Sequence, residues 1–203
     1  MGGYRMIEKA DVIEFFDRNA PGWDAELVRD DAVIERILDN GGIVPGCHAL
    51  DVACGTGVLF PDYIKRKVGS VTAVDISPGM AEIAGKKSRD TQIQVICGDV
   101  EALTFHRLFD CCMVYNAFPH FPNPERLIQV LAGHLRPEGR LSIAHGMSRD
   151  KINERHGGAA RRVSEGLMEA RELAELFAPY FKVDTVISDE RMYQVSGVKL
   201  REG

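Results

Sequence analysis

Two glycines that follow a short apolar run are the strongest chemical signal in this 203-residue sequence. Residues 49–60 read ALDVACGTGVLF, so an expected strand leads into Gly55-Thr56-Gly57 and then into further apolar residues. Paired glycines allow positive φ and let the backbone pass close to a ligand. The helix start that follows would offer unpaired N–H groups and a positive dipole end. We expect the turn to be the floor of a ligand site; the alternative is an ordinary strand–helix turn.

An acidic residue about twenty positions later strengthens this interpretation. Residues 71–75 form a β-rich run that ends in Asp75, and a carboxylate there can accept both hydroxyls of a ribose. A nicotinamide-binding turn would need a third glycine near position 60, where Phe60 stands. The acidic Asp51, which opens the turn, is a second feature that disfavours a dinucleotide.

Three motifs together resemble those of a known family. The segments DVACGTG (51–57), VDIS (74–77) and GDVEAL (98–103) resemble the class I S-adenosylmethionine (SAM)-dependent methyltransferases. They are most similar to the branch that contains the ubiquinone and menaquinone C-methyltransferases. The similarity runs from about residue 12 to residue 147, and Ala53 stands where many members have a first glycine. The resemblance implies SAM as cofactor, S-adenosylhomocysteine (SAH) as product, and a small-molecule acceptor.

The resemblance also implies roles for residues at the ends of successive strands. Asp75 would hold the ribose, Asp99 would accept from the adenine amino group, and Val100 would cover the ring. The alternative for Asp99 is a capping role at a strand end. The expected cofactor-binding residues are Asp51, Ala53, Cys54, Gly55, Gly57, Asp75, Ile76, Asp99, Val100 and Asn116.

Methyl transfer from a sulfonium requires the protein to align the nucleophile and exclude water, and a base can assist. The candidate catalytic residues are Asn116, His120, His145 and His156, of which Asn116 and His120 would face the methyl group. His120 could be a general base. The three histidines could instead hold a metal, but their spacing matches no known ligand motif, so no metal is expected. Each could also be a hydrogen-bonded structural histidine.

The loop 116–122 narrows the expected acceptor. It lacks the Asn-Pro-Pro-aromatic motif of methyltransferases that act on planar amines, so methylation of adenine or of a glutamine side chain is disfavoured. Two rival functions stand beside the enzyme hypothesis. A NAD-type oxidoreductase is disfavoured by the missing third glycine and by the lack of a Tyr-x-x-x-Lys pair. A non-catalytic SAM-binding regulatory or partner subunit would bind the cofactor without turnover.

Composition is that of a soluble globular domain, with 45% hydrophobic and 27% charged residues. The net charge of −5 disfavours nucleic acid and anionic membranes as partners. The N-terminal sequence lacks the apolar stretch of a signal peptide, and no apolar run approaches the roughly 20 residues of a membrane span. We expect a cytoplasmic enzyme and consider a homodimer. The five cysteines lack a CxxC pair, which predicts buried, reduced thiols.

The hydrophobic pattern predicts one α/β domain over residues 1–203, with a Rossmann-like, doubly wound fold. Its seven-stranded sheet would be mostly parallel with an antiparallel C-terminal edge. The expected strands are 47–53, 70–75, 93–97, 109–115, 140–146, 181–188 and 191–200. The expected helices are 7–19, 30–39, 58–67, 78–87, 123–135 and 169–178. Residues 135–139 would form a turn.

Two further segments are expected to cover the site. Residues 1–42 would be an N-terminal helical lid, because FFDRNAPGWD resembles the segment that closes over cofactor and substrate in the same branch. Phe16 and Trp23 would then exclude water; the alternative is a surface helix. Residues 147–166 would form a polar cap before the last helix. Its arginines could meet an anionic substrate or simply face solvent; they are Arg149, Arg155, Arg161 and Arg162.

Overall fold

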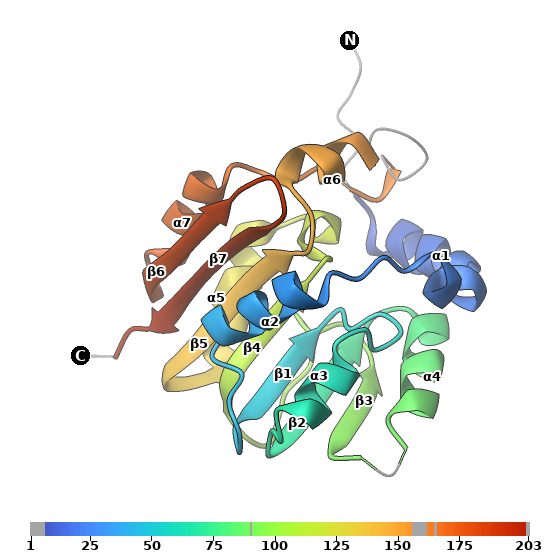
Figure 1. The fold of residues 1–203 in the computed structure, drawn as a ribbon, viewed down its shortest axis with the longest axis horizontal. Helices are drawn as coiled ribbons and strands as arrows, with labels where there is room; N and C mark the ends of the chain where they lie inside the picture. Colours follow the sequence, from blue (N-terminus) through green and yellow to red (C-terminus); the bar gives the residue numbers. More distant parts are fainter. Residues whose placement is uncertain (1–6, 90, 156–161, 165, 202–203) are drawn as a thin grey trace.

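A seven-stranded sheet organises the chain in the computed structural model, which describes residues 7–89, 91–155, 162–164 and 166–201 (Figure 1). The strands are β1 (His48–Val52), β2 (Ser70–Asp75), β3 (Ile93–Cys97), β4 (Phe109–Tyr115), β5 (Leu135–His145), β6 (Phe181–Ser188) and β7 (Tyr193–Lys199). Their order is β3-β2-β1-β4-β5-β7-β6. β7 pairs antiparallel with both β5 and β6, and the other pairs in this sheet are parallel. The predicted Rossmann-like fold with an antiparallel C-terminal edge is confirmed.

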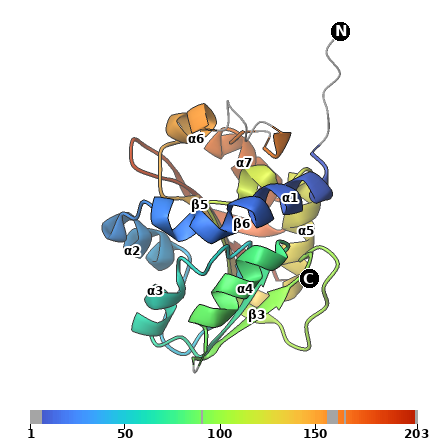
Figure 2. The ribbon, with the colours of Figure 1, turned by 90° about the vertical axis from the view of Figure 1, so that its right-hand side faces the viewer.

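Helices cover both faces of the sheet (Figures 1 and 2). They are α1 (Lys9–Asn19), η1 (Ala20–Glu26), α2 (Asp31–Asn40), α3 (Phe60–Lys65), α4 (Pro78–Lys87), η2 (Phe118–His120), α5 (Pro124–His134), α6 (Arg149–Arg155) and α7 (Ala170–Phe177). Buried residues of α2, α3 and α4 form one core, and those of α5 and α7 form the other. No described helix has the length and apolarity that a membrane crossing needs.

The central strand β4 is apolar because its side chains enter these two cores. On β4, Cys111 and Met113 face the core of α2 and α3, while Cys112 and Val114 face the core of α5 and α7. Successive side chains point to opposite faces, so a central strand covered on both sides is apolar throughout.

Four expectations need correction. β5 begins at Leu135 instead of 140, because Leu135 still pairs with Phe109 before the register shifts in a bulge. The first helix begins at Lys9 instead of residue 7, and a 3-10 helix, η1, follows it directly from Ala20. α3 is shorter than predicted, because the turn extends to Leu59. Cys97 is exposed because β3 is an edge strand.

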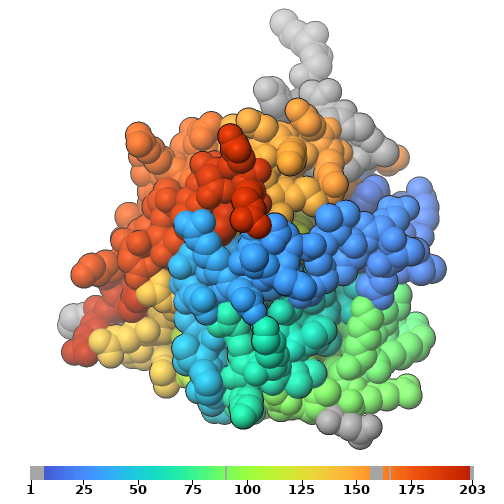
Figure 3. All heavy atoms as spheres, viewed as in Figure 1, coloured from blue at the N-terminus to red at the C-terminus, as the bar shows by residue number. Residues whose placement is uncertain are grey.

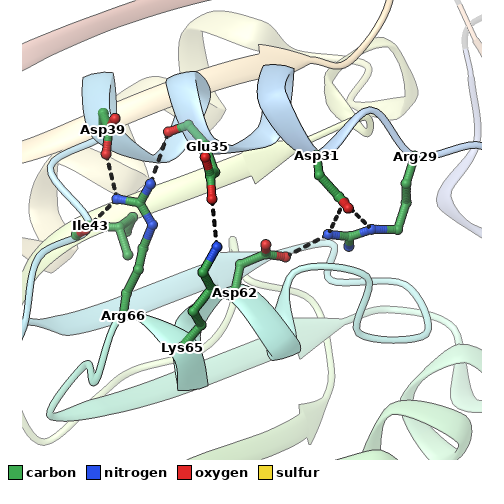
Figure 4. Close-up of polar contacts among 8 residues, drawn as sticks. All are labelled: Arg29, Asp31, Glu35, Asp39, Ile43, Asp62, Lys65 and Arg66. Carbon is green, nitrogen blue, oxygen red and sulfur yellow. Dashed lines mark hydrogen bonds and ion pairs between the residues drawn. The ribbon is translucent and has the colours of Figure 1, made fainter.

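Polar contacts fasten α2 and the residues before it to α3 (Figure 4). Arg29 donates to the Val58 carbonyl and to Asp62, the latter over 3.0 Å. Arg66 donates to Asp39 over 2.6 Å. Exposed ion pairs add little stability individually. The contact of Arg29 with Val58 nevertheless ties the N-terminal segment to the chain that follows the glycine turn.

The glycine turn depends on the absence of a side chain at position 57. Gly57 has φ +85°, and a Cβ there would lie 2.6 Å from the Phe60 ring. Left-handed backbone costs an alanine about 1–2 kcal/mol, and the clash adds to that. We expect Gly57→Ala to lower the free energy of unfolding by at least about 2 kcal/mol in urea titrations.

Gly55→Ala is the matched control for this prediction. Gly55 also has positive φ, +56°, but a Cβ there would meet no atom within 4 Å. It should therefore cost only the conformational strain of about 1–2 kcal/mol. Equal losses in the two variants would contradict the role assigned to the Phe60 contact.

Candidate functional site

A cavity of about 390 Å³ lies at the carboxyl ends of the parallel strands. The chain passes from β1 to β2 and β3 on one side and places β4 and β5 on the other. Such a switch in strand order is where open α/β sheets bind ligands. Residues after β1, β2 and β3 line one half of the cavity, and residues after β4 and β5 line the other. We call these the first half and the second half.

The first half is built on the glycine turn and Asp75. Asp75 Oδ2 accepts from the Gly55 N–H at 2.8 Å, and its Oδ1 accepts from the Ser77 N–H at 2.9 Å. Burial raises the pKa of Asp75, while these two hydrogen bonds act against that rise. The carboxylate thus fixes the turn. Ala53, Cys54, Gly55, Asp75 and Ile76, all predicted site residues, line the cavity together.

Asp51 and Gly57 are placed differently from the other predicted cofactor-binding residues, since neither lines the cavity. Asp51 is buried. Burial, and then the charge of Asp75, raise the pKa of Asp51 to about 8. Its carboxyl group is therefore mostly neutral at pH 7. Asp51 is thus buried within β1 and does not line the cavity, and the strand pattern alone could not show this.

The protonation of Asp51 predicts a pH-dependent stability. In the unfolded chain its pKa would be near 3.8, against about 8 in the folded protein. Between these values the unfolded state binds fewer protons, so stability falls as pH rises, by at most about 1.4 kcal/mol per pH unit. Asp51→Asn should reduce this slope between pH 5 and 8 in urea titrations. The pKa of Asp75 is raised in the same direction, so the Asp51→Asn variant should keep a smaller slope. Identical slopes in both proteins would contradict the assignment.

The end of β3 supplies Asp99 and Val100, which both line the cavity. Asp99 is already engaged by the N-terminal segment, because the Lys9 ammonium lies 2.5 Å from Asp99 Oδ2 and 2.6 Å from Glu101 Oε2. Lys9 also lines the cavity. Sequence analysis missed Lys9, since its partners lie about ninety residues away and no local pattern marks the pairing.

The second half joins the ends of β4 and β5. Asn116 has φ +55°, and its Oδ1 accepts from the Gly146 N–H at 2.9 Å. His120 Nδ1 lies 2.7 Å from the Val163 carbonyl oxygen. A carbonyl oxygen only accepts, so the hydrogen of this bond lies on Nδ1. His120 and Asn116 both line the cavity.

The structure describes one of the other two predicted histidines, His145, but not His156. His145 is buried at the end of β5, lines the cavity and packs its ring 6.1 Å from that of Tyr193. His156 lies outside the described residues. Within the described chain, no three His, Cys, Asp or Glu side chains are grouped as metal ligands would be. The structure thus brings His120, His145 and Asn116 to one cavity.

The N-terminal segment, in blue, lies between the C-terminal part of the chain and the helices α3 and α4 (Figures 1 and 3), and several of its residues line the cavity. Asp17 Oδ1 accepts from the Ser77 hydroxyl at 2.5 Å and from the Gly79 N–H at 2.9 Å. Asp24 accepts from the Thr56 hydroxyl at 2.6 Å. These contacts were not predicted; they attach α1 and η1 to the loops after β2 and β1.

The aromatic residues of this segment face inward. The rings of Phe16 and Trp23 are 5.5 Å apart, and Phe16 packs edge-on against His120 at 4.9 Å. Both aromatic residues line the cavity. The arrangement can hold a ligand with polar groups at the strand ends and an apolar cover.

Comparison with known proteins agrees with this geometry. Residues 50–143 match the family model of a methyltransferase domain. The malonyl-[acyl-carrier protein] O-methyltransferase of Priestia megaterium is 37% identical over 140 residues, which cover 67% of this chain and 51% of that relative. The chain spans about half the length of the first curated relatives it matches.

Solved structures share the fold. The DhpI–SAH complex structure has a TM-score of 0.75 at 19% identity and covers 99% of this chain and 100% of that chain. The methyltransferase solved with the Haloferax volcanii Trm112 methyltransferase activator has a TM-score of 0.77 at 16% identity, over 92% and 98% of the two chains. With the motifs, the sheet and the cavity, the matches establish that this chain belongs to the class I SAM-dependent methyltransferases.

Proposed function

We propose that this protein transfers a methyl group from SAM to a small-molecule acceptor that binds in the same cavity. The observation that carries the proposal is the Asp75 carboxylate, held by two backbone N–H groups beside the glycine turn at the cavity wall. A carboxylate at the end of the second strand suits the ribose hydroxyls of a nucleoside cofactor.

The remaining cofactor contacts follow from the first half of the cavity. The backbone of Ala53, Cys54 and Gly55 would approach the amino-acid end of SAM, and Ile76 would lie next to the ribose. Asp99 and Val100 would bind the adenine. Because Lys9 already pairs with Asp99, adenine binding would have to share or displace that contact. Asp51 and Gly57 would act by holding the turn.

The second half would position the acceptor. SAM supplies an activated methyl group, so the protein mainly aligns the nucleophile, excludes water and removes a proton. His120 fits the role of base, because its ring lines the cavity and is held there by the Nδ1 contact with the Val163 carbonyl. Asn116 and His145 would line the path of the methyl group.

Two covering segments support a small acceptor. Residues 1–42 would act as a lid, since Lys9, Asp17 and Asp24 attach this segment around the cavity. Residues 147–166 would act as a cap, to which α6 contributes Ile152 and Arg155. An enclosed, largely apolar space suits a small molecule more than a protein side chain. Cytoplasmic location, a homodimer and the absence of nucleic-acid partners belong to the same proposal; the net charge of −5 supports the last of these.

A transfer assay tests this proposal. The protein is incubated with SAM carrying a labelled methyl group and with the small-molecule and protein fractions of a cell extract. We expect label in the small-molecule fraction and accumulation of SAH. Label in the protein fraction alone would refute a small acceptor. SAH binding with no transfer to either fraction would favour a non-catalytic subunit.

A further inference from the structure

The arginines of the cap segment differ in how they are bound. Arg149 donates to the Leu167 carbonyl and pairs with Glu169, each over 2.9 Å. Arg162 lies 4.0 Å from Asp11. Arg161 lies outside the described residues. Arg155, at the end of α6, is the described arginine of this group that lines the cavity.

Arg155 carries no ion pair to any residue within the described ranges. The other charged residues that line the cavity are already engaged or lie in the first half. Lys9 is bound by two carboxylates, and Asp75 accepts two backbone N–H groups. Glu26 of η1 also lines the cavity, and within the described chain it forms no ion pair with Arg155. Arg155 is therefore the uncompensated charge of the second half, as far as the described chain shows.

Arg155 is exposed to solvent, but it lines a half of the cavity that also has apolar residues. Ile152 lies on the same helix, and Met147 and Phe121 line the same half of the cavity. A guanidinium binds a charged carboxylate through two parallel N–H groups. An acceptor with a carboxylate at one end and an apolar body would satisfy both features.

We propose that Arg155 is a specificity residue that binds the carboxylate of an apolar acid, the acceptor class of this protein. The inference rests on the proposed function. A carboxylate fits better than a phosphate because a single guanidinium matches one negative charge, and Lys9, the other Lys or Arg among the described lining residues, is held by Asp99 and Glu101. The bound carboxylate would direct the apolar body toward His120 and Phe16.

Calorimetry on the SAH-loaded protein tests this assignment. The probes are two matched pairs, octanoate with octanamide and benzoate with benzamide. We expect the acids to bind at least about 10-fold more tightly than the amides, since a charge-assisted hydrogen bond adds about 1.5–3 kcal/mol. Arg155→Met should remove this preference, and Arg155→Lys should keep part of it.

Lys151→Met is the matched control. Lys151 is an exposed cation on the same helix and does not line the cavity, so its loss should leave the preference for acids unchanged. Equal affinity for acid and amide in the wild type, or equal losses in Arg155→Met and Lys151→Met, would overturn the proposal.

The affinity for SAH distinguishes a failure of this proposal from a failure of the proposed function. Arg155→Met should retain the wild-type affinity for SAH. A large loss of SAH affinity in this variant would assign Arg155 to the cofactor and overturn its acceptor role. If the wild type itself does not bind SAH, the proposed function fails first, whatever the acids do.

Discussion

Asp75→Ala is expected to weaken SAM and SAH binding by about 100-fold. Two charge-assisted hydrogen bonds to the ribose hydroxyls, at about 1.5 kcal/mol each, account for this factor. The variant should also lose stability, because Gly55 and Ser77 would lose the acceptor of their N–H groups. Calorimetric titration with SAH measures the affinity, and urea unfolding measures the stability.

Asp110→Ala separates the two effects of the Asp75 change. Asp110 also accepts a backbone N–H, from His48 over 2.7 Å, but it lies near the start of β4 at the opposite end of the sheet. This control should lose stability and keep its SAH affinity. SAH affinity of Asp75→Ala within about threefold of wild type, or about 0.7 kcal/mol, would contradict the ribose assignment.

His120→Ala is expected to lower kcat by about 100- to 10,000-fold, the usual contribution of a positioned base. The cofactor contacts lie in the other half of the cavity, so SAH affinity should stay close to wild type. The labelled product found by the transfer assay provides the rate measurement. Added imidazole should restore part of the activity, because it can occupy the space left by the ring.

His48→Ala is the control for the His120 change. The His48 ring bonds the Ser70 hydroxyl at 2.8 Å, and His48 begins β1 at the amino end of the sheet, away from the cavity. It should leave kcat unchanged. A His120→Ala variant with nearly full kcat would show that the ring serves only to pack against Phe16.

Local sequence patterns predicted the bounds of helices and strands well where the residues at the ends marked a clear boundary. β2, β3 and β4 have the predicted ends because each is a β-rich run with a glycine or a polar residue beside it: Gly69 before β2, Gly98 after β3 and Asn116 after β4. α4 begins as predicted, since the Ser77 hydroxyl accepts from the Met80 N–H at 3.1 Å and Pro78 follows the cap.

Contacts between distant segments could not be predicted in the same way. The pairing of Lys9 with Asp99 and the caps that Asp17 supplies to α4 join residues sixty or more positions apart. Nor could the sequence decide that Asp75 lines the cavity whereas Asp51 is buried below it, because both acids stand at the ends of apolar strands. Among the cap arginines, only the three-dimensional contacts distinguish Arg155 from Arg149.

Thermal unfolding with SAM, SAH and NAD in parallel tests the central claim, that the cavity binds SAM, most directly. A ligand at 100 times its Kd adds about 2.7 kcal/mol, which corresponds to about 5–10 °C for a chain of this size. We predict that SAM and SAH raise Tm by this amount, that NAD does not, and that Asp75→Ala loses the response. No shift with SAM or SAH, or a shift with NAD instead, would contradict the assignment of the cavity.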